Sequence, residues 1–262
     1  MRSLFRQILS KPKPLPMLYP PAPSGWTVFA VGDIHGRLDC LLRVQALIDT
    51  AMLQCEDKQR CAEIYLGDFV DRGPHSAQVL ENIHQRQNLR HVGLVQGNHE
   101  TMMLGYLAGD VSFESWKAFG GAETLLSYGI SEKLLRAEND ALRHTALATI
   151  PAAHIALISN AKRHIKFGSY CFAHAGIRPG VDLEDQPPKD LTWVRSEFLE
   201  SSEDLGFIVV HGHTAVQEID FRRNRINVDT GAYITNVLSA IRIDAQGVSV
   251  LSPPGDRQNP PE

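Results

Sequence analysis

Gly67-Asp68-Phe69-Val70-Asp71-Arg72-Gly73 is the stretch that decides the fold of this 262-residue chain. It follows the short apolar run Ile64-Tyr65-Leu66, which predicts a buried strand. The glycines at both ends indicate a tight loop, and this loop carries two carboxylates and a guanidinium. Two acids beside an arginine suit a metal ion and a bound anion.

The same unit, a strand followed by a polar glycine loop and a helix, occurs three times in the first half of the chain. The predicted strands are 27–31, 62–66 and 92–95, and the predicted helices are 38–53, 76–87 and one that starts near Thr101. The two further loops are Gly32-Asp33-Ile34-His35-Gly36 and Gln96-Gly97-Asn98-His99-Glu100. Strands that alternate with helices predict an α/β sheet that holds ligands at the carboxyl ends of its strands.

The second half of the chain is predicted to contain mostly strands. They span residues 155–158, 169–173, 207–210, 225–228 and 234–243, with hairpin turns at 222–224 and 245–247. Two of these strands end in polar loops, His174-Ala175-Gly176 and His211-Gly212-His213-Thr214.

The chain is predicted to form one catalytic domain between two tails. Residues 1–25 are rich in proline and form a predicted N-terminal tail, the domain spans 26–251, and 252–262 form a loose C-terminal tail. Within the domain, residues 102–150 form a helical insertion over one side of the loops, with a break at Gly120-Gly121. Its aromatic residues Trp116, Phe119 and Tyr128 are interpreted as packing residues.

Composition excludes several classes of protein. A formal net charge of −4 gives no basic footprint for nucleic acid. No run approaches the roughly 18 apolar residues of a membrane span. The four cysteines form no Cys-x-x-Cys pair, which indicates reduced thiols and a cytoplasmic location. There is no Gly-x-Ser-x-Gly motif and no Gly-x-x-x-x-Gly-Lys loop, so neither a serine nucleophile of that type nor that type of nucleotide triphosphatase is expected.

The polar residues at the predicted strand ends form one candidate site. They are Asp33, His35, Asp68, Asp71, Arg72, Asn98, His99, His174, His211 and His213. Oxygen and imidazole ligands without thiolate suit manganese, iron, zinc, cobalt or nickel. There are more ligands than one ion needs, but two ions about 3.5–4 Å apart and bridged by a carboxylate would use them.

The series Gly-Asp-Ile-His-Gly, Gly-Asp-Phe-Val-Asp-Arg-Gly, Gly-Asn-His-Glu, His-Ala-Gly and Gly-His-Thr resembles the calcineurin-like metallophosphoesterases. More narrowly, it resembles the bacterial branch of the phosphoprotein (serine/threonine) phosphatases, from about Val28 to Ile243. The resemblance implies a β-sandwich of mixed sheets flanked by helices, with the helical insertion over the active-site edge. It also implies two divalent metal ions as cofactors, with manganese the first candidate.

The resemblance implies a metal role for six residues. Asp33 and His35 would hold the first ion, Asp68 would bridge both ions, and the second ion would be held by Asn98, His174 and His213. His211 and His213 compete for one ligand position, and the family pattern selects His213 because it follows the glycine. His211 would then fix its neighbour's tautomer or be structural.

Four further residues receive catalytic roles from the resemblance. His99 would protonate the leaving oxygen, Asp71 would orient His99, and Arg72 would bind phosphate oxygens. Arg195, in Trp193-Val194-Arg195, would be a second phosphate clamp or, alternatively, a surface arginine near Glu197 and Glu200. Glu100 lies next to His99 and would support the ligands around it, and Asp229-Thr230-Gly231 would support the floor of the site.

These residues predict a dinuclear metal-dependent phosphohydrolase in which a hydroxide shared by the two ions attacks phosphorus in line. The expected substrate is a phosphorylated protein or a small phosphoester, and the expected activity is that of a phosphoprotein or phosphomonoester phosphatase. The alternative within the fold is a symmetrical diadenosine tetraphosphate hydrolase. A non-catalytic binding protein on the same fold is a remote alternative, because none of the expected ligands is missing.

Overall fold

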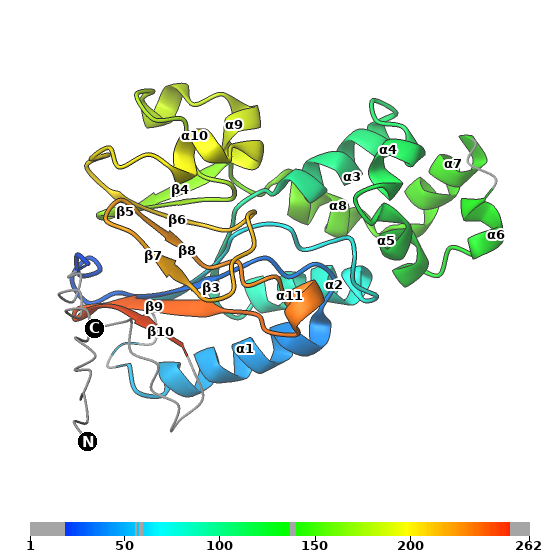
Figure 1. The fold of residues 1–262 in the computed structure, drawn as a ribbon. Helices are drawn as coiled ribbons and strands as arrows, with labels where there is room; N and C mark the ends of the chain where they lie inside the picture. Colours follow the sequence, from blue (N-terminus) through cyan, green and yellow to red (C-terminus); the bar gives the residue numbers. More distant parts are fainter. Residues whose placement is uncertain (1–18, 56, 58–59, 137–139, 252–262) are drawn as a thin grey trace, which may run out of the picture.

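Two five-stranded mixed sheets pack face to face in the computed structural model, with helices on their outer sides (Figure 1). The structure describes residues 19–251 except 56, 58–59 and 137–139. This is the predicted α/β sandwich of mixed sheets.

The first sheet has the strand order β10-β9-β1-β2-β3. Its strands are β1 (Thr27–Val31), β2 (Cys61–Tyr65), β3 (His91–Leu94), β9 (Ala240–Asp244) and β10 (Gly247–Val250). β1, β2 and β3 are parallel, whereas β9 and β10 form an antiparallel hairpin at the edge. The carboxyl ends of the three parallel strands therefore lie on the same side of the sheet.

The second sheet has the order β4-β5-β6-β8-β7. Its strands are β4 (His164–Phe167), β5 (Tyr170–Ala173), β6 (Ile208–His211), β7 (Asp220–Phe221) and β8 (Arg225–Asn227). β5, β6 and β8 are parallel, and the edge strands β4 and β7 are antiparallel to their neighbours. Both predicted hairpins are present, as β7–β8 and β9–β10.

Helices lie against the outer faces of both sheets and beside them. They are α1 (Leu38–Met52), α2 (Ser76–Gln87), α3 (Asn98–Ala108), α4 (Phe113–Lys117), α5 (Gly121–Ser127), α6 (Glu132–Leu135), α7 (Asp140–Thr149), α8 (Ala152–Ser159), α9 (Pro188–Trp193), α10 (Ser196–Leu199) and α11 (Ala232–Thr235), with a short 3₁₀ helix at Leu183–Asp185. Figure 1 shows α3 to α8 grouped beside the sheets, while α9 and α10 lie against the second sheet. The predicted insertion, residues 102–150, covers α4 to α7 and most of α3, so Asn98 and His99 lie before it.

Successive side chains on a strand point to opposite faces of its sheet, and both faces are covered here, which explains why whole strands are buried. On β1, Phe29 and Val31 face a core shared with α1, α2 and the insertion, whereas Val28 and Ala30 face the core between the sheets. On β5, Phe172 likewise faces the inter-sheet core, and Ala173 faces the core beneath α9 and α10. Because both faces of each sheet are covered, these strands read as continuous apolar runs in the sequence.

Two of the predicted strands were wrong. Residues 155–158 lie inside helix α8, because a four-residue apolar run fits a buried helix face as well as a strand. Residues 234–243 do not form one strand: α11 comes first, Asn236 ends it at a φ of 63°, and β9 begins only at Ala240. The third helix also begins earlier than predicted, at Asn98 instead of near Thr101.

The packed part of the chain begins before the predicted domain start at residue 26. Tyr19 and Ala22 are buried in the inter-sheet core, and the Tyr19 hydroxyl donates a hydrogen bond to the Arg222 carbonyl. Their extended, proline-rich segment packs through side chains and single hydrogen bonds, so it needs no full sheet ladder. Residues 1–18 and 252–262 lie outside the described part, so the tails predicted there remain predictions.

All four cysteines are free, as predicted. No single helix among the described residues is long and apolar enough to cross a membrane; α7 and α8 pass that test only as a pair bent by 94°.

Candidate metal and phosphate site

Loops after five parallel strands bring the predicted site residues together. Asp33 and His35 follow β1, Asp68 to Arg72 follow β2, and Asn98 and His99 open α3 directly after β3. His174 follows β5, and His213 follows β6. Backbone bonds connect the loops: the amides of Ile34 and His35 donate to the Asp68 carbonyl, and the amide of Gly212 donates to the His174 carbonyl. The two sheets therefore contribute to one site.

Unusual backbone conformations concentrate at this site. Among the described non-glycine residues with positive φ, five of six belong to it, namely His35, Asp68, Asp71, Arg72 and His213. Such a φ costs an ordinary side chain about 1–3 kcal/mol and persists only where the surroundings impose it. The loops are thus held in shapes that favour the placement of side chains over local stability.

Asp68 occupies the centre of the cluster. Its carboxylate belongs to two groups of potential ligand atoms, each within 4.8 Å of one another: His35, Asp68 and His99, and Asp68, His174 and His213. The Asp68 oxygens lie 3.5 Å from His35 Nε2 and 3.3 Å from His174 Nε2. One carboxylate shared by two groups is the arrangement that a bridging ligand requires.

Backbone carbonyls orient two of the histidines. His35 Nδ1 donates to the Val70 carbonyl at 3.0 Å, and His174 Nδ1 donates to the Leu66 carbonyl at 2.8 Å. With Nδ1 used in this way, Nε2 of each ring faces Asp68 and is available to coordinate an ion.

Polar atoms without partners indicate that the residues fit metal ions. Asp33 Oδ1 and His213 Nε2 are buried and have no hydrogen-bond partner among the described residues. Asp33 Oδ2 accepts a hydrogen bond from the His213 amide, and Asn98 Oδ1 lies 2.9 Å from His174 Nε2 and 3.0 Å from His213 Nδ1. Buried atoms without partners are costly, and an ion would satisfy them.

The charges at the centre of the site also suit cations. Burial would raise the pKa of Asp68, but His174 and His99 hold it well below its usual range. Burial opposes a charge on His174, yet Asp68 raises the pKa of that imidazole to about 10. Burial lowers the pKa of His35 to about 3, so its imidazole is neutral. A protonated His174 therefore balances the charge of Asp68, and a metal ion can take the place of that positive charge.

His99 and Asp71 form a buried, hydrogen-bonded pair beside the cluster. His99 Nδ1 lies 2.7 Å from Asp71 Oδ2, and both side chains are buried. Burial opposes a charge on His99, but Asp68 and Asp71 outweigh it and raise the pKa of the imidazole. The pair can therefore hold a proton and donate it.

The helical insertion supplies further donors to this pair, which sequence reasoning missed. The Trp116 indole N–H donates to Asp71 at 2.9 Å, and the Thr124 hydroxyl donates to it at 2.7 Å. The Asp71 amide donates in return to the Thr124 hydroxyl. Trp116 was interpreted as a packing residue, and it does pack at 0% exposure, but its polar atom serves Asp71. The Gly120-Gly121 break was the available signal, because a side chain on Gly121 would collide with the Trp116 ring.

Arg72 is fixed on three sides. Its amide donates to the Gly120 carbonyl, its guanidinium lies 4.3 Å from the centre of the Tyr233 ring, and its Nη2 lies 3.2 Å from His99 Nε2. The guanidinium is thus placed next to His99, the predicted leaving-group acid. Tyr233 was not expected from the sequence; it lies one residue before the strand predicted for residues 234–243, and the structure has it in α11.

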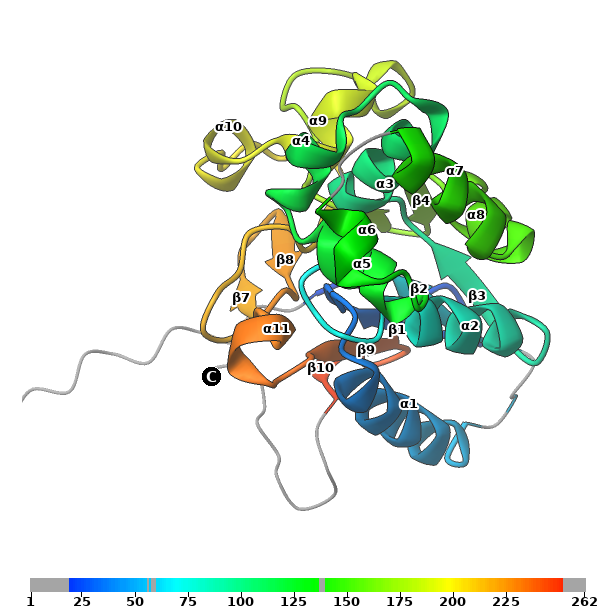
Figure 2. The same ribbon diagram turned by 90° about the vertical axis from the view of Figure 1, so that its right-hand side faces the viewer.

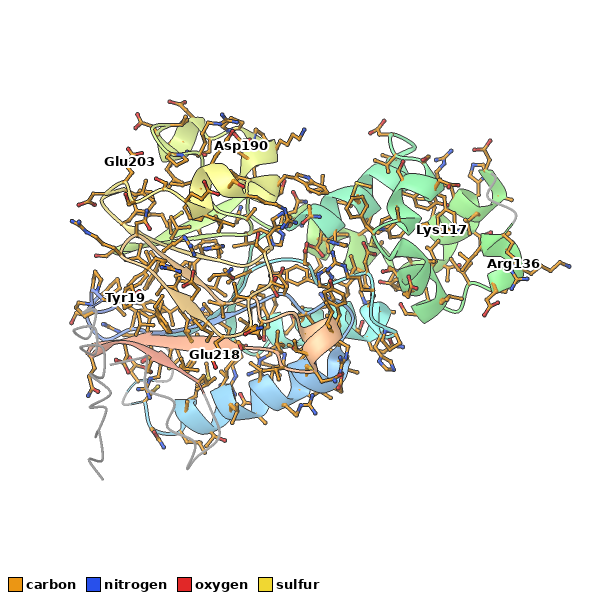
Figure 3. All side chains as sticks on the ribbon, viewed as in Figure 1. Tyr19, Lys117, Arg136, Asp190, Glu203 and Glu218 are labelled. Carbon is orange, nitrogen blue, oxygen red and sulfur yellow. The ribbon has the colours of Figure 1, made fainter. Side chains whose placement is uncertain are left out.

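Arg195 lies at the edge of the site. Its Nη1 donates to the Thr214 hydroxyl at 3.2 Å, directly after His213. Glu197, its proposed surface partner, pairs instead with Arg178, which also bonds Asp190. Figure 3 labels Asp190, which lies on α9. Arg195 itself is exposed, so its role as a phosphate clamp stays a prediction.

Glu100 holds the two central loops together. Its carboxylate accepts hydrogen bonds from the amides of Asp68, Phe69, Val70 and Gly97. Burial, with Asp68 nearby, raises its pKa to about 7. Because α3 begins at Asn98, Glu100 lies in the first helical turn and reaches back to these amides. Its position beside His99 had suggested a supporting role, and the contacts show which backbone it supports.

His211 is separate from the cluster. Its ring packs against Phe198 with centroids 5.1 Å apart, its Nδ1 lies 3.1 Å from the Gly212 carbonyl, and burial lowers its pKa to about 3. The structure thus places His213, not His211, beside Asp68. Asp229 accepts a hydrogen bond from the Gly231 amide, and burial together with the nearby Asp229 raises the pKa of Asp33, consistent with a place for Asp229 in the floor of the site.

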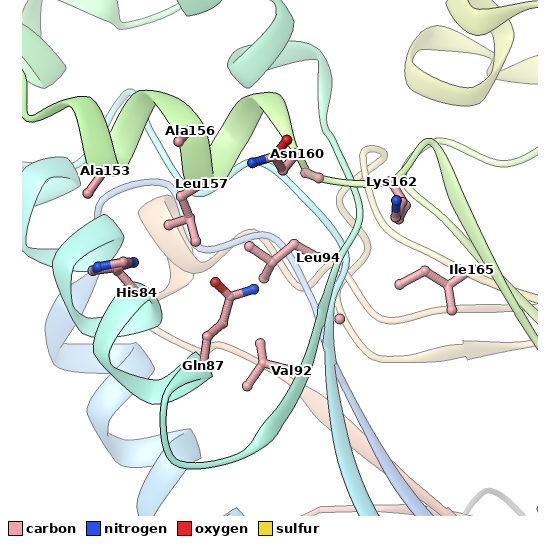
Figure 4. A pocket seen from close by; sticks show the side chains of 12 residues that line it. His84, Gln87, Val92, Leu94, Ala153, Ala156, Leu157, Asn160, Lys162 and Ile165 are labelled. Carbon is pink, nitrogen blue, oxygen red and sulfur yellow. The ribbon is translucent and has the colours of Figure 1, made fainter.

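A cavity of about 350 Å³ lies elsewhere in the molecule. Figure 4 shows its lining between α2, β3 and α8, with His84 and Gln87 from α2, Val92 and Leu94 from β3, and Leu157 from α8. Its lining includes none of the predicted ligands, so it is distinct from the candidate site.

Comparison with known proteins agrees with this geometry. The family model described as calcineurin-like phosphoesterase matches residues 27–245. The asymmetrical bis(5'-nucleosyl)-tetraphosphatase PrpE of Oceanobacillus iheyensis is 25% identical over 242 residues, covering 85% of this chain and 91% of that protein. The same enzyme of Anoxybacillus flavithermus is 26% identical over 206 residues, covering 72% and 78%.

Solved structures share the fold. A putative diadenosine tetraphosphatase superposes with a TM-score of 0.60 at 19% identity, covering 87% of this chain and 94% of that one. A cold-active protein tyrosine phosphatase superposes with a TM-score of 0.54 at 17% identity, covering 93% and 83%. A serine/threonine phosphatase from Saccharomyces cerevisiae gives 0.52 at 13% identity, covering 89% and 82%.

Proposed function

Because this chain belongs to the calcineurin-like phosphoesterase family, we propose that it is a dinuclear metal-dependent hydrolase of dinucleoside polyphosphates. The observation that carries the proposal is the Asp68 carboxylate, shared by two groups of ligand atoms. Asp33 and His35 would complete the first metal position, and Asn98, His174 and His213 would complete the second. Manganese is the first candidate for both ions.

When bound, the two ions supply an activated water as nucleophile and offset negative charge on the substrate. The chain itself supplies the rest of the chemistry. Arg72 and Arg195 bind phosphate oxygens by charge-assisted hydrogen bonds and so fix the phosphorus in place. His99 donates its proton to the leaving oxygen, and Asp71 holds the imidazole in the orientation that this donation needs.

The named relatives favour the substrate class. These relatives are named as asymmetrical tetraphosphatases, and the match covers most of both chains. This moves the first candidate from the phosphoprotein phosphatase expected from the sequence to a dinucleotide hydrolase. It also favours asymmetrical over symmetrical cleavage.

Phosphomonoester or phosphoprotein hydrolysis is the second candidate, and the His99–Asp71 pair favours it. A serine or threonine alkoxide is a poor leaving group, so its departure depends on a proton from a positioned acid. A nucleotide leaves as a phosphate oxygen, which is a far weaker base. The raised pKa of His99 and its 2.7 Å contact with Asp71 are what the first kind of leaving group demands.

A substrate panel with Mn²⁺ separates these candidates. It comprises diadenosine tetraphosphate and peptides carrying phosphoserine, phosphothreonine or phosphotyrosine, with kcat/KM measured for each and the nucleotides separated by chromatography. We expect diadenosine tetraphosphate to be the best substrate and to give ATP and AMP. A product that is ADP alone supports symmetrical cleavage instead, and faster release of phosphate from the peptides supports the second candidate.

A further inference from the structure

Three half-buried aromatic residues from distant parts of the chain contact the histidines of the site. Phe119, in the turn between α4 and α5, meets His99 with ring centroids 5.9 Å apart. Trp193, at the end of α9, meets His213 at 5.9 Å, and Tyr233, on α11, meets His35 at 5.1 Å. Figure 2 shows α4, α5, α9 and α11 around the side of the molecule that carries these loops.

Phe119 and Trp193 form a pair. Their rings lie 5.6 Å apart at 79°, an edge-to-face contact that joins the helical insertion to α9. Tyr233 differs from these two residues, because the Arg72 guanidinium already lies over its ring. The Phe119–Trp193 pair thus runs from the proposed acid His99 to the proposed metal ligand His213.

Burial distinguishes this pair from ordinary packing residues. Trp116, only three residues from Phe119, is 0% exposed, whereas Phe119 and Trp193 each keep part of their surface open. Apolar area left in water costs roughly 25 cal/mol per Å². A half-open aromatic pair beside a polar site is what a planar ligand group would cover.

Asymmetrical cleavage places a planar group at this distance from the reaction. The broken anhydride joins the phosphate that carries adenosine to the next phosphate, so one adenine is a single ribose away from the scissile phosphorus. In symmetrical cleavage each adenine is one phosphate further away. In either case the water oxygen bonds to one phosphorus, the bridging oxygen leaves with the other, and His99 supplies a proton to it.

We propose that Phe119 and Trp193 form a stacking platform for the adenine next to the scissile phosphate, and that this platform selects the asymmetrical bond. The inference rests on the proposed dinucleotide hydrolysis and adds the residues that set its cleavage position. The platform would stack on any planar ring that is bonded close to the scissile phosphate. An aryl phosphate ester carries such a ring, as the adenosine end of the dinucleotide does.

The test compares Phe119→Leu and Trp193→Leu with wild type, using the Mn²⁺-loaded protein. The first readout is the ratio of ATP plus AMP to ADP from diadenosine tetraphosphate, which does not depend on the fraction of active protein. The second is kcat/KM for diadenosine tetraphosphate divided by that for ring-free inorganic tripolyphosphate. Phe207→Leu is the matched control, because Phe207 is half-buried and lies before β6, at the end of the strand away from the site.

We expect each platform variant to release a larger share of ADP and to lower the second ratio about tenfold, as expected for loss of one base–aromatic stacking contact. Phe119→Trp should restore both readouts, and Phe207→Leu should change neither. Unchanged product and substrate ratios in both leucine variants would overturn the platform.

Failure of the proposed function gives a different result. If wild type cleaves phosphoesters but not diadenosine tetraphosphate, the dinucleotide proposal is wrong. The platform is then tested by the ratio of kcat/KM for an aryl phosphate to kcat/KM for glycerol phosphate. A fall of that ratio in Phe119→Leu supports the platform, and an unchanged ratio overturns it.

Discussion

The strand-end loops and the helical insertion contribute different chemistry to one site. The loops carry all the proposed metal ligands, packed around Asp68. The insertion contributes none of these, but its Trp116 and Thr124 bond Asp71, and its Phe119 contacts His99. We therefore propose that the loops hold the cations, whereas the insertion serves the proposed proton donor, His99, and the substrate.

This division predicts that metal binding and turnover are separable in this protein. Asp71 is the junction, since it follows β2 in the same loop as Asp68 but is surrounded by groups from α4 and α5. Damage to the loops should remove metal and activity together. Damage to the insertion's contacts should lower activity and leave the metal in place.

Asp68→Asn should have the largest effect. An amide cannot bridge two cations as a carboxylate does, so bound metal should be lost, and turnover should fall by on the order of 10³-fold or more. Metal content by mass spectrometry and hydrolysis of an aryl phosphate measure the two together. Full metal content in this variant would contradict the central place given to Asp68.

His99→Asn should separate the two properties. It removes the proton donor but none of the proposed ligands, so turnover should fall about 10²- to 10⁴-fold while metal stays bound. The same two measurements apply. A loss of metal equal to that in Asp68→Asn would show that His99 is itself a ligand, as its nearness to His35 and Asp68 would allow.

His213→Ala and His211→Ala sharpen the comparison within one loop. His213 joins Asp68 and His174, whereas His211 packs on Phe198, so metal affinity should fall about 10- to 100-fold in the first variant and little in the second. Titration calorimetry with Mn²⁺ measures both affinities. A larger loss of affinity in His211→Ala would reverse the ligand assignment.

Trp116→Phe tests the insertion with the smallest change. It keeps the ring but removes the N–H that Asp71 accepts, so turnover should fall about tenfold with metal content unchanged. Trp26→Phe is the matched control, because Trp26 packs on Phe167 just before β1, at the end of the strand away from the loops. Equal activity losses in the two variants would mean that Trp116 only packs.

The sequence predicted the loops well because their signals are local. Each follows a β-branched or apolar strand, and parallel strands must end on the same side, so Asp33, Asp68 and Asn98 had to meet. His174 and His213 were placed by the same reasoning from the second sheet.

The contribution of the insertion could not be predicted in this way. Trp116 and Thr124 lie on helices whose pattern only indicates burial, and their partner Asp71 is far away in the sequence. Tyr233 could not be predicted for a similar reason. It comes just before residues 234–243, whose pattern predicts a strand, whereas the structure has the short helix α11 there, which ends at Asn236 in a left-handed conformation. Contacts of this kind depend on tertiary packing, which local patterns do not encode.

Metal removal followed by stepwise return tests the central claim most directly. The protein is stripped with a chelator, Mn²⁺ is added back in fractions of an equivalent, and bound metal and aryl phosphate hydrolysis are measured at each step. The account predicts no activity in the stripped protein, two ions bound per chain at saturation, and activity that rises as the second site fills. Hydrolysis that survives chelation, or that is complete with a single ion, would contradict it.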